Sequence, residues 1–376
     1  MRVGVFHWTF NSFGGGEKVA MDIAKALGLK EVYTLFSSAE KDDIKAVDIS
    51  YLLPRWAKIA GKLTKRERVL EYWLWEMIDP RDLGDFDVVI TSGVTPRAML
   101  AQENTMHVNY CYSTPRWLFD LWHYRRKIAK NRFHIFFFAS LLRIMDVCVD
   151  SRVDYYFVGS ELIQKRLWHY LKRDSVVLYP SIEVSKYRSE KDDGYILHMG
   201  RFDVEKQIMP VVKACEILNE RLILTGGKGT DKQTYEYVLK NNGKVIDYRG
   251  FVSEKEKIDL LAHAKAVVYN PLNEDFGIIP LEALASGKPV IVNYTGFPPI
   301  LLAKTGILDE KDGVKICKGG LITSPTPEGI AKALKLLDEV EWDARAMIEF
   351  ARTFDFSEFE RKLKEQLNVW LKEFKR

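Results

Sequence analysis

Short runs of β-branched and aromatic residues alternate along this chain with segments whose apolar positions recur at helical spacing. The short runs predict ten strands, because each is bounded by polar or glycine-containing turns. The predicted strands are 3–7, 32–36, 87–91, 107–112 and 155–159 in the first half, and 195–199, 222–225, 245–248, 266–270 and 289–293 in the second half. Strands separated by helices indicate α/β architecture with parallel sheets and right-handed crossovers.

Each half of the chain offers enough strands for its own doubly wound, Rossmann-like sheet, and 376 residues suit two domains better than one. The polar, charged run 180–194 predicts the junction, so we expect domains over residues 1–180 and 181–355. The tail 356–376 predicts an amphipathic helix with Phe359, Leu363, Leu367 and Trp370 on one face. We expect this helix to pack back on the N-terminal domain. Two such sheets facing across a cleft would bind a ligand at the carboxyl ends of their strands.

The composition excludes several classes of protein. With 47% hydrophobic and 29% charged residues the chain is globular, and a net charge of +4 does not by itself imply nucleic-acid binding. The four cysteines are scattered, which argues against a zinc site or a disulfide framework and fits a reducing cytosol. The chain begins with a strand rather than a signal peptide, and the most apolar stretch, 134–149, is too short and too charged to span a bilayer.

Two carboxylates bracket the most informative loop of the sequence. Glu274 and Glu282 stand eight residues apart, and Pro280 between them suits the first turn of a helix. The helix start offers N–H groups to an anion or polar ligand. Eight helical residues would separate the carboxylates by roughly 12 Å, too far for a catalytic dyad but suited to the two ends of a long polar ligand. Two surface acids at a helix start are an equally good interpretation.

Two cations follow the strand at 195–199. Arg201 and Lys206 would neutralise a diphosphate leaving group as its charge develops. The alternative is a solvated loop with a local ion pair to Asp203 or Glu205.

Two further strand ends offer backbone groups to a ligand. Gly14, Gly15 and Gly16 follow the first strand and open a helix at 18–27, so the backbone could approach a ligand closely, although an ordinary turn is possible. This is not the dinucleotide motif. The backbone at Phe251 and Val252 could bind a base edge, and a helix cap at Ser253 explains the same residues equally well.

Two basic stretches with interleaved aromatic residues lie in the first half, at 53–75 and 116–138. Such residues suit an anionic membrane surface or a lipid-phosphate acceptor. Single-stranded nucleic acid would use the same residue types, and core packing would account for many of the aromatic rings.

Taken in order, these motifs resemble those of retaining GT4-type glycosyltransferases of the GT-B fold. The resemblance covers nearly the whole chain and is strongest over 195–296, where the pair Glu274 and Glu282 matches the family's Glu-x7-Glu signature. The first half resembles the mannosyltransferase-like branch that acts on lipid-linked glycans, through its segments 14–17, 87–93 and 110–120.

The resemblance implies an N-terminal acceptor domain and a C-terminal nucleotide-sugar donor domain. It implies catalytic roles for Arg201 and Lys206 at the donor diphosphate and for Glu274 at the transferred sugar, with Glu282 on the ribose hydroxyls. Donor contacts are implied for Gly15, Gly16, Phe251, Val252, Phe276, Gly277, Ile278 and Ile279. It also implies no metal and no cofactor, with a GDP- or UDP-linked sugar as co-substrate.

One residue departs from the resembled branch. Tyr112 occupies the place of a histidine that lies near the transferred sugar, and a tyrosine cannot be cationic at neutral pH. His7 is a second candidate for that role and Arg116 a third on the acceptor side. The donor sugar, a hexose such as mannose or a related sugar, therefore stays open.

The expected function is transfer of a hexose, with retention, from a nucleotide sugar to a lipid-linked or membrane-associated glycan. The alternatives are a sugar-nucleotide epimerase or hydrolase on the same fold, or a non-catalytic binding protein. We expect an anionic membrane surface as a partner, no nucleic acid, and a cytoplasmic protein peripheral to the inner face of the cell membrane.

Overall fold

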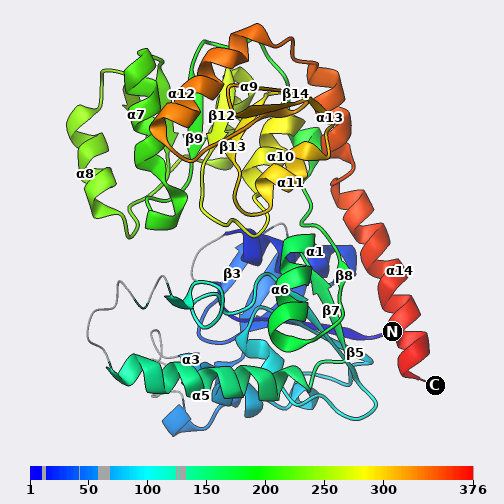
Figure 1. Cartoon of the computed structure of the whole chain (residues 1–376). Coiled ribbons are helices and arrows are strands. Elements are labelled where there is room, and N and C mark those ends of the chain that lie inside the picture. The colour runs from blue at the N-terminus through cyan, green and yellow to red at the C-terminus, as the bar shows by residue number, and fades with distance from the viewer. Residues whose placement is uncertain (11–13, 42, 58–67, 124–125, 127–132, 376) are drawn as a thin grey trace. The chain divides into compact units, whose positions relative to one another are not determined.

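The computed structural model describes residues 1–10, 14–41, 43–57, 68–123, 126 and 133–375. The chain divides into two compact units, Met1–Ser181 together with Phe356–Arg376, and Ile182–Asp355. Each unit contains one eight-stranded sheet with helices packed against it (Figure 1). The predicted α/β class with doubly wound, mostly parallel sheets is confirmed.

The sheet of the N-terminal unit has the strand order β3-β4-β2-β1-β5-β6-β7-β8 and is parallel except for β3. Its strands are β1 (Val3–His7), β2 (Glu31–Thr34), β3 (Ala39–Lys41), β4 (Ile44–Asp48), β5 (Val88–Ser92), β6 (Met106–Cys111), β7 (Tyr155–Val158) and β8 (Val176–Val177). The described helices are α1 (Gly15–Ala26), α3 (Arg68–Glu76), α5 (Phe133–Asp150), α6 (Glu161–Leu171) and α14 (Phe356–Phe374), with 3-10 turns η1 (Ser50–Leu52), η2 (Pro80–Asp82) and η3 (Thr95–Ala98).

Alternate residues of each strand point to opposite faces, and this period divides the N-terminal core into two layers. Val3 and Val5 of β1 pack with α1 and α14 on one face. Phe6 packs with α3, α5 and η3 on the other. The apolar stripe predicted for the tail is buried, since Phe359, Leu363, Leu367 and Trp370 of α14 all contact the first layer.

The sheet of the C-terminal unit has the order β11-β10-β9-β12-β13-β16-β15-β14, with β14 and β15 antiparallel. Its strands are β9 (Ile196–Met199), β10 (Leu222–Thr225), β11 (Ile246–Tyr248), β12 (Ala266–Tyr269), β13 (Val290–Asn293), β14 (Ile307–Lys311), β15 (Val314–Cys317) and β16 (Gly320–Thr323). Its helices are α7 (Ile208–Leu218), α8 (Lys232–Asn241), α9 (Glu254–His263), α10 (Ile278–Ala285), α11 (Pro298–Ala303), α12 (Pro327–Leu336) and α13 (Ala344–Arg352), with 3-10 turns η4 (Val184–Lys186), η5 (Val204–Lys206) and η6 (Leu337–Glu339).

The strand orders place one topological switch point in each sheet. In the N-terminal unit β1 pairs with β2 on one side and β5 on the other. In the C-terminal unit β9 pairs with β10 on one side and β12 on the other. Loops leave a switch point in opposite directions, which opens a crevice at the carboxyl ends of the strands. The loops after β1, β5, β9 and β12 are therefore the places to look for a site.

The segment predicted as the junction between the domains is only partly solvated. The boundary between the units falls at Ser181 and Ile182, and residues 188–194 are exposed. Tyr187, in contrast, points inward and reaches α10 of the C-terminal unit. In the part of the chain that the structure describes, no helix combines the length and the apolar character needed to cross a membrane.

Candidate functional site

The switch point of the C-terminal unit brings an oppositely charged pair together. Lys206 ends the loop after β9, Glu274 lies in the loop after β12, and Lys206 Nζ contacts Glu274 Oε2 at 2.7 Å. Both side chains are about one quarter exposed, so they remain reachable from solvent. Two residues 68 positions apart in sequence therefore share one site. The parallel pairing of β9 with β12 is the cause.

The loop that carries Glu274 is held in place by its neighbours rather than by a helix. Asn273 has φ 51, in the left-handed region, and its N–H donates to Thr295 Oγ1. Phe297 N–H donates to the Glu274 carbonyl, and a Cβ on Gly296 would lie 2.5 Å from the Glu274 nitrogen. Because Glu274 precedes α10, the separation of roughly 12 Å expected for eight helical residues does not apply to the pair.

The N-terminus of α10 faces the same loop. Gly277 is its N-cap with φ 87, a conformation that favours glycine, and no side chain caps the helix. Pro280 lies in the first turn, as predicted from the sequence. The free N–H groups of Ile278 and Ile279 therefore remain for a ligand. Phe276 is buried and stacks on Phe297, so its side chain serves packing.

Glu282 lies inside α10 and is not a surface acid. Its side chain is 7% exposed, and its Oε1 atom accepts from Lys257 Nζ at 2.7 Å and from Tyr187 OH at 2.8 Å. The interpretation as two surface acids is therefore wrong for Glu282. Burial, followed by the charge of Glu282, raises the pKa of the Tyr187 phenol far above its ordinary value.

A buried histidine lies on the strand that leads into the cationic loop. His198 of β9 is completely buried, and its Nδ1 lies 2.8 Å from the Val268 carbonyl of β12. Because a carbonyl only accepts, Nδ1 carries the hydrogen. Burial lowers the pKa of His198 to about 4, so it is neutral at pH 7. The charge of this site therefore comes from its lysines and carboxylates.

Arg201 differs from Lys206 in its surroundings. Its guanidinium is 69% exposed and contacts Asp203 at 3.0 Å, which is the local ion pair that the alternative interpretation expected. The structure thus brings Lys206 to Glu274 and leaves Arg201 on the exposed side of the same loop.

The loop after β11 contains both features that the sequence suggested. Phe251 is 90% exposed, next to Gly250 with φ 67. Ser253 caps α9, since its Oγ accepts from Glu256 N–H while the Glu256 carboxylate accepts from Ser253 N–H. The backbone around Phe251 and Val252 is thus held at a helix start.

The switch point of the N-terminal unit contains a chain of uncharged side chains. His7 ends β1, Ser92 ends β5 and Tyr112 follows β6. His7 Nδ1 lies 2.9 Å from Ser92 Oγ, Ser92 Oγ contacts the Tyr112 hydroxyl, and that hydroxyl donates to the Gly16 carbonyl at 2.8 Å. This series of hydrogen bonds therefore ends on the first turn of α1. The helix begins at Gly15, about one turn earlier than predicted.

The donor in each of these three hydrogen bonds can be assigned from the last acceptor, the Gly16 carbonyl. The Gly16 carbonyl cannot donate, so the Tyr112 hydroxyl must donate to it. Ser92 then donates to the Tyr112 oxygen, and His7 Nδ1–H donates to Ser92. Burial lowers the pKa of His7 to about 3 and raises that of Tyr112 well above its ordinary value. Neither residue carries charge at neutral pH.

The first-turn glycine of α1 packs directly on the tyrosine ring. A Cβ on Gly16 would lie 3.5 Å from the ring of Tyr112, so ring and backbone are in contact. Gly14 is the N-cap, and the Glu17 carboxylate accepts from its N–H at 3.0 Å. Arg116, the third candidate on this side, is held by Asp120 at 2.9 Å.

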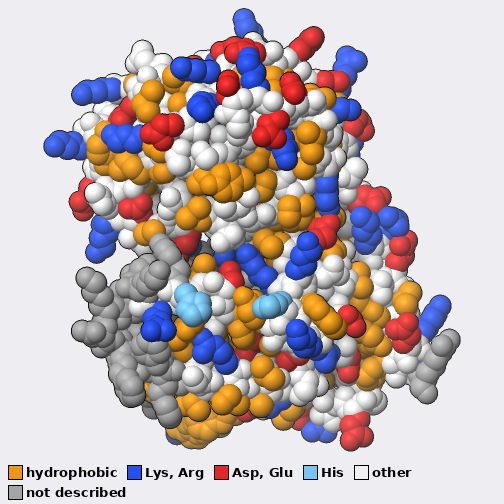
Figure 2. Space-filling view, viewed as in Figure 1, with side chains coloured by type: hydrophobic (Ala, Val, Ile, Leu, Met, Phe, Trp, Pro, Cys, Tyr) orange, Lys and Arg blue, Asp and Glu red, His pale blue; other side chains and the backbone are white. Residues whose placement is uncertain are grey.

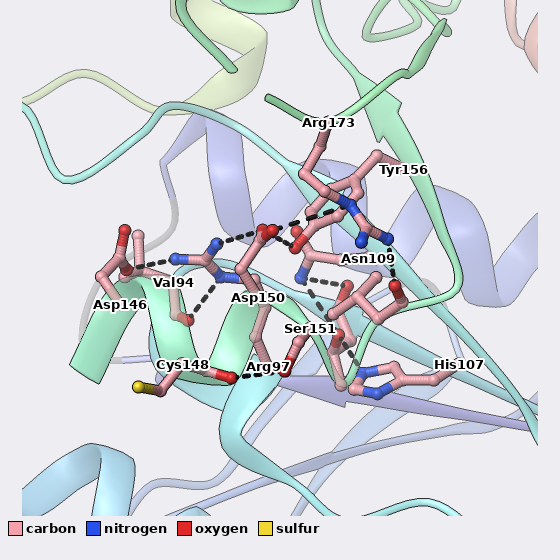
Figure 3. Close-up of polar contacts among 12 residues, drawn as sticks. Val94, Arg97, His107, Asn109, Asp146, Cys148, Asp150, Ser151, Tyr156 and Arg173 are labelled. Carbon is pink, nitrogen blue, oxygen red and sulfur yellow. Dashed lines mark hydrogen bonds and ion pairs between the residues drawn. The ribbon is translucent and has the colours of Figure 1, made fainter. Parts of the chain in front are cut away.

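The charges buried in the N-terminal unit lie in the turn after β5 and on α5, and they were not recognised in the sequence. Arg97 of η3 is 2% exposed and its guanidinium lies between Asp146 and Asp150 of α5 (Figure 3). Tyr72 OH donates to Asp146 at 2.6 Å, and Tyr156 OH donates to Asp150 at 2.5 Å. The sequence feature that could have indicated these buried charges is the pair Asp146 and Asp150, four residues apart in the mostly apolar helix α5.

The two basic-aromatic stretches divide between core and surface. Tyr72, Trp75 and Leu118 are buried, as the core interpretation expected. Trp56 and Trp73 are about half exposed and contact each other with ring centroids 5.4 Å apart. The basic residues Lys58, Lys62, Lys65, Arg66, Arg125, Lys127, Lys130 and Arg132 lie outside the described residues.

Comparison with known proteins finds a family match within the second unit. The family of glycosyl transferases group 1 matches residues 180–354. The human alpha-1,3/1,6-mannosyltransferase ALG2 is 32% identical over 173 residues, which cover 38% of this chain and 42% of that enzyme. A GDP-mannose-dependent alpha-(1-6)-phosphatidylinositol dimannoside mannosyltransferase of Mycobacterium tuberculosis is 29% identical over 147 residues, covering 38% and 35%. The matched part thus spans less than half of either relative.

Among solved structures, the sucrose-phosphate synthase of Thermosynechococcus elongatus superposes with a TM-score of 0.71 at 16% identity, covering 99% of this chain and 96% of that one. Similarity at this identity concerns the fold, and it confirms the predicted GT-B class.

Proposed function

We propose that the chain transfers a hexose from a nucleotide sugar to a lipid-linked or membrane-associated glycan, a proposal that the match of residues 180–354 to the glycosyl transferases group 1 family supports. The observation that carries this proposal is the convergence of Lys206, Glu274, Glu282 and the uncapped α10 N-terminus around one switch point. Mannosyltransferases among the relatives favour mannose or a related hexose, carried by GDP or UDP.

The leaving group is the first requirement of such a transfer. A nucleoside diphosphate gains negative charge as the sugar departs, and fixed cations or helix N-termini stabilise that charge. We assign this role to Lys206, the more exposed Arg201 and the N–H groups of Ile278 and Ile279. In this proposal they replace a metal ion, and no cofactor takes part.

The sugar and the ribose need acceptors for their hydroxyl hydrogens. Glu274 lies where its carboxylate can exchange Lys206 for the transferred sugar, because both groups of the pair are accessible to solvent. Glu282 is proposed to accept the ribose hydroxyls. When donor binds, Lys206 then turns to the diphosphate and the resting ion pair separates. Transfer proceeds with retention, the departing phosphate taking the acceptor's proton.

The N-terminal unit supplies the glycine loop and the acceptor side in this proposal. Gly15 and Gly16 contribute backbone to the donor, with Arg116 as an acceptor-side cation. Tyr112 replaces the histidine of the resembled branch, and its hydroxyl is committed to Gly16. Its contribution is therefore to shape the loop rather than to bind a sugar hydroxyl.

A membrane surface is proposed to bring the enzyme to its acceptor. Phe138, Leu141, Ile144 and Val147 of α5 are between 39% and 60% exposed at helical spacing, and hydrophobic side chains group at the bottom of the view in Figure 2. Asp146 and Asp150, the acids of α5, are buried, so no carboxylate interrupts the stripe. A basic run, 125–132, precedes α5 in the sequence. An apolar helix face next to basic residues suits an anionic bilayer.

The catalytic proposal is tested by giving purified protein each of a panel of UDP- and GDP-hexoses, alone and with a synthetic lipid-linked diphosphate glycan. Transfer only when donor and acceptor are both present supports a transferase, and the anomeric configuration of the product reports retention. An altered sugar from donor alone would instead make the protein an epimerase or hydrolase. Binding without turnover would make it a binding protein.

The membrane proposal has a separate test. The double variant Ile144→Ser with Val147→Ser should reduce co-sedimentation with anionic vesicles by several-fold, because two exposed apolar side chains are lost. Leu239→Ser on α8, where Leu239 is 49% exposed, is the matched control and should bind as wild type does. If wild type, the double variant and Leu239→Ser all bind vesicles equally, α5 does not contact the membrane.

A further inference from the structure

Glu282 is held on one side only. Both of its hydrogen bonds, from Lys257 Nζ and from Tyr187 OH, end on Oε1. Oε2 has no hydrogen-bond partner among the described residues, and it is not among the polar atoms that are sealed from solvent without a partner. Oε1 thus accepts two hydrogen bonds, while Oε2 remains available to accept hydrogen bonds from a ligand.

The two donors come from elements that are themselves fixed. Lys257 lies in the first half of α9, whose start is held by the Ser253–Glu256 capping box. Its Nζ also contacts Glu254 at 3.1 Å, and its side chain is 22% exposed. Tyr187 follows η4, on the segment that enters the C-terminal unit from Ile182. Nearby, Lys288 Nζ donates to the Glu190 carbonyl at 2.6 Å, which holds that segment against the unit.

The asymmetry of Glu282 has a chemical meaning. A carboxylate oxygen has two lone-pair sites, and both sites on Oε1 are occupied. The two sites on Oε2 match two hydroxyl donors on adjacent carbons, such as the 2′ and 3′ hydroxyls of a ribose. We propose that Lys257 and Tyr187 are positioning residues that fix the Glu282 carboxylate with Oε2 presented to a vicinal diol. This inference rests on the proposed function and deepens it.

Lys257 has a second task, which is to give Glu282 a counter-charge. A buried carboxylate loses hydration, and a cation in direct contact offsets that loss. Lys257 Nζ supplies this contact at 2.7 Å from Glu282 Oε1.

The experiment compares nucleotides that differ only in the diol. Binding of UDP and GDP to the full-length protein is measured by calorimetry, beside their 2′,3′-dideoxy forms. Wild type should prefer the ribose form by about 10- to 100-fold, since a hydrogen bond to a charged group contributes that much. Lys257→Met should reduce the preference to within about threefold, and Tyr187→Phe should reduce it several-fold.

Rescue by a conservative variant separates positioning from a merely structural role. Lys257→Met should lose the ribose preference while it keeps wild-type affinity for the dideoxy nucleotides. Lys257→Arg should restore most of the preference by returning the cation. The dideoxy nucleotides should bind all variants alike, because they do not use Glu282.

Matched controls lie in the same unit. Lys265→Met removes a lysine of similar exposure that pairs with Glu220 and Asp338, and Tyr195→Phe removes a buried hydroxyl that donates to Leu260. Both should keep the wild-type preference. Tyr187→Phe, which loses a single atom, serves as the test if Lys257→Met does not fold.

Three outcomes are distinguishable. A collapse of the ribose preference in the Lys257 and Tyr187 variants alone establishes the positioning role. If wild type and variants share the same ribose preference, the inference fails while the proposed function stands. If wild type binds neither UDP nor GDP, the proposed function fails and the inference falls with it.

Discussion

The two units have the same kind of switch point, but the side chains at the strand ends are charged in one unit and uncharged in the other. In the C-terminal unit the strand ends carry Lys206 and Glu274, a charged pair open to solvent. In the N-terminal unit the strand ends carry His7, Ser92 and Tyr112, all uncharged, with His7 and Tyr112 both hydrogen-bonded to Ser92. Its buried charges, Arg97 with Asp146 and Asp150, lie in the core instead.

A shared topology can therefore serve two purposes. A charged pair in contact with water can exchange its partners for a ligand at small cost, so it is suited to binding. A buried neutral chain has no spare donor for a ligand and must break internally to make one, so it is suited to holding a loop in shape. Charge and exposure, rather than strand order, separate the two roles.

The largest effect is expected for the buried guanidinium. Arg97→Met should lower the free energy of unfolding by about 3–5 kcal/mol, because it removes the buried cation beside Asp146 and leaves Asp150 only its 3.6 Å contact with Arg173. Denaturant unfolding measures this. Arg81→Met, at an exposed pair with Asp79, should leave stability unchanged. A small loss for Arg97 would mean that the N-terminal charges do not hold its core.

Glu274→Ala should show the opposite pattern. Transfer should fall at least about 100-fold, as expected when one preorganised electrostatic contact is removed, while the melting temperature stays near that of wild type. Steady-state kinetics and thermal denaturation measure the two quantities. Glu236→Ala on the exposed face of α8 is the control and should be fully active. Near-normal turnover in Glu274→Ala would sink the assignment of the site.

Lys206 and Arg201 lie in one loop and differ in exposure. Lys206→Met should weaken binding of a nucleoside diphosphate about tenfold, because it removes a cation already in the site. Arg201→Met should cost less, since its guanidinium is mostly exposed and must reorient to bind. Calorimetry with UDP and GDP measures both. The reverse order would make Arg201 the principal phosphate ligand.

Tyr112→Phe should produce the smallest effect. It removes the hydroxyl that Gly16 and Ser92 share, and a buried group left without a partner costs about 1–3 kcal/mol. Activity should fall only a few-fold, with an unchanged pH profile from 6 to 8 because no charge is involved. Tyr33→Phe, whose hydroxyl makes only a 3.5 Å contact with Glu31, is the control. A loss as large as that of Glu274→Ala would give Tyr112 a role at the sugar.

The sequence predicted ten of the sixteen described strands. All ten predicted strands are present within one or two residues of their expected ends, because buried parallel strands are continuous apolar runs. The strands that were not predicted are β3, β4, β8, β14, β15 and β16, and among them β16 is buried throughout. They include the hairpin of β14 and β15, in which every residue of β14 is exposed. Its turn at Asp312 and Gly313, both with positive φ, carries the Asp-Gly signal that marks such hairpins.

By itself the sequence determined the α/β class, the residues at the strand ends and the helix start after Glu274, because these depend on local pattern and turn chemistry. The tertiary structure decided which of those residues meet. Tyr187 reaches Glu282 across 95 positions and Tyr112 reaches Gly16 across 96. Such partners are set by strand order and helix packing, and no local pattern records them. The same packing decides which charges stay in water and which are buried.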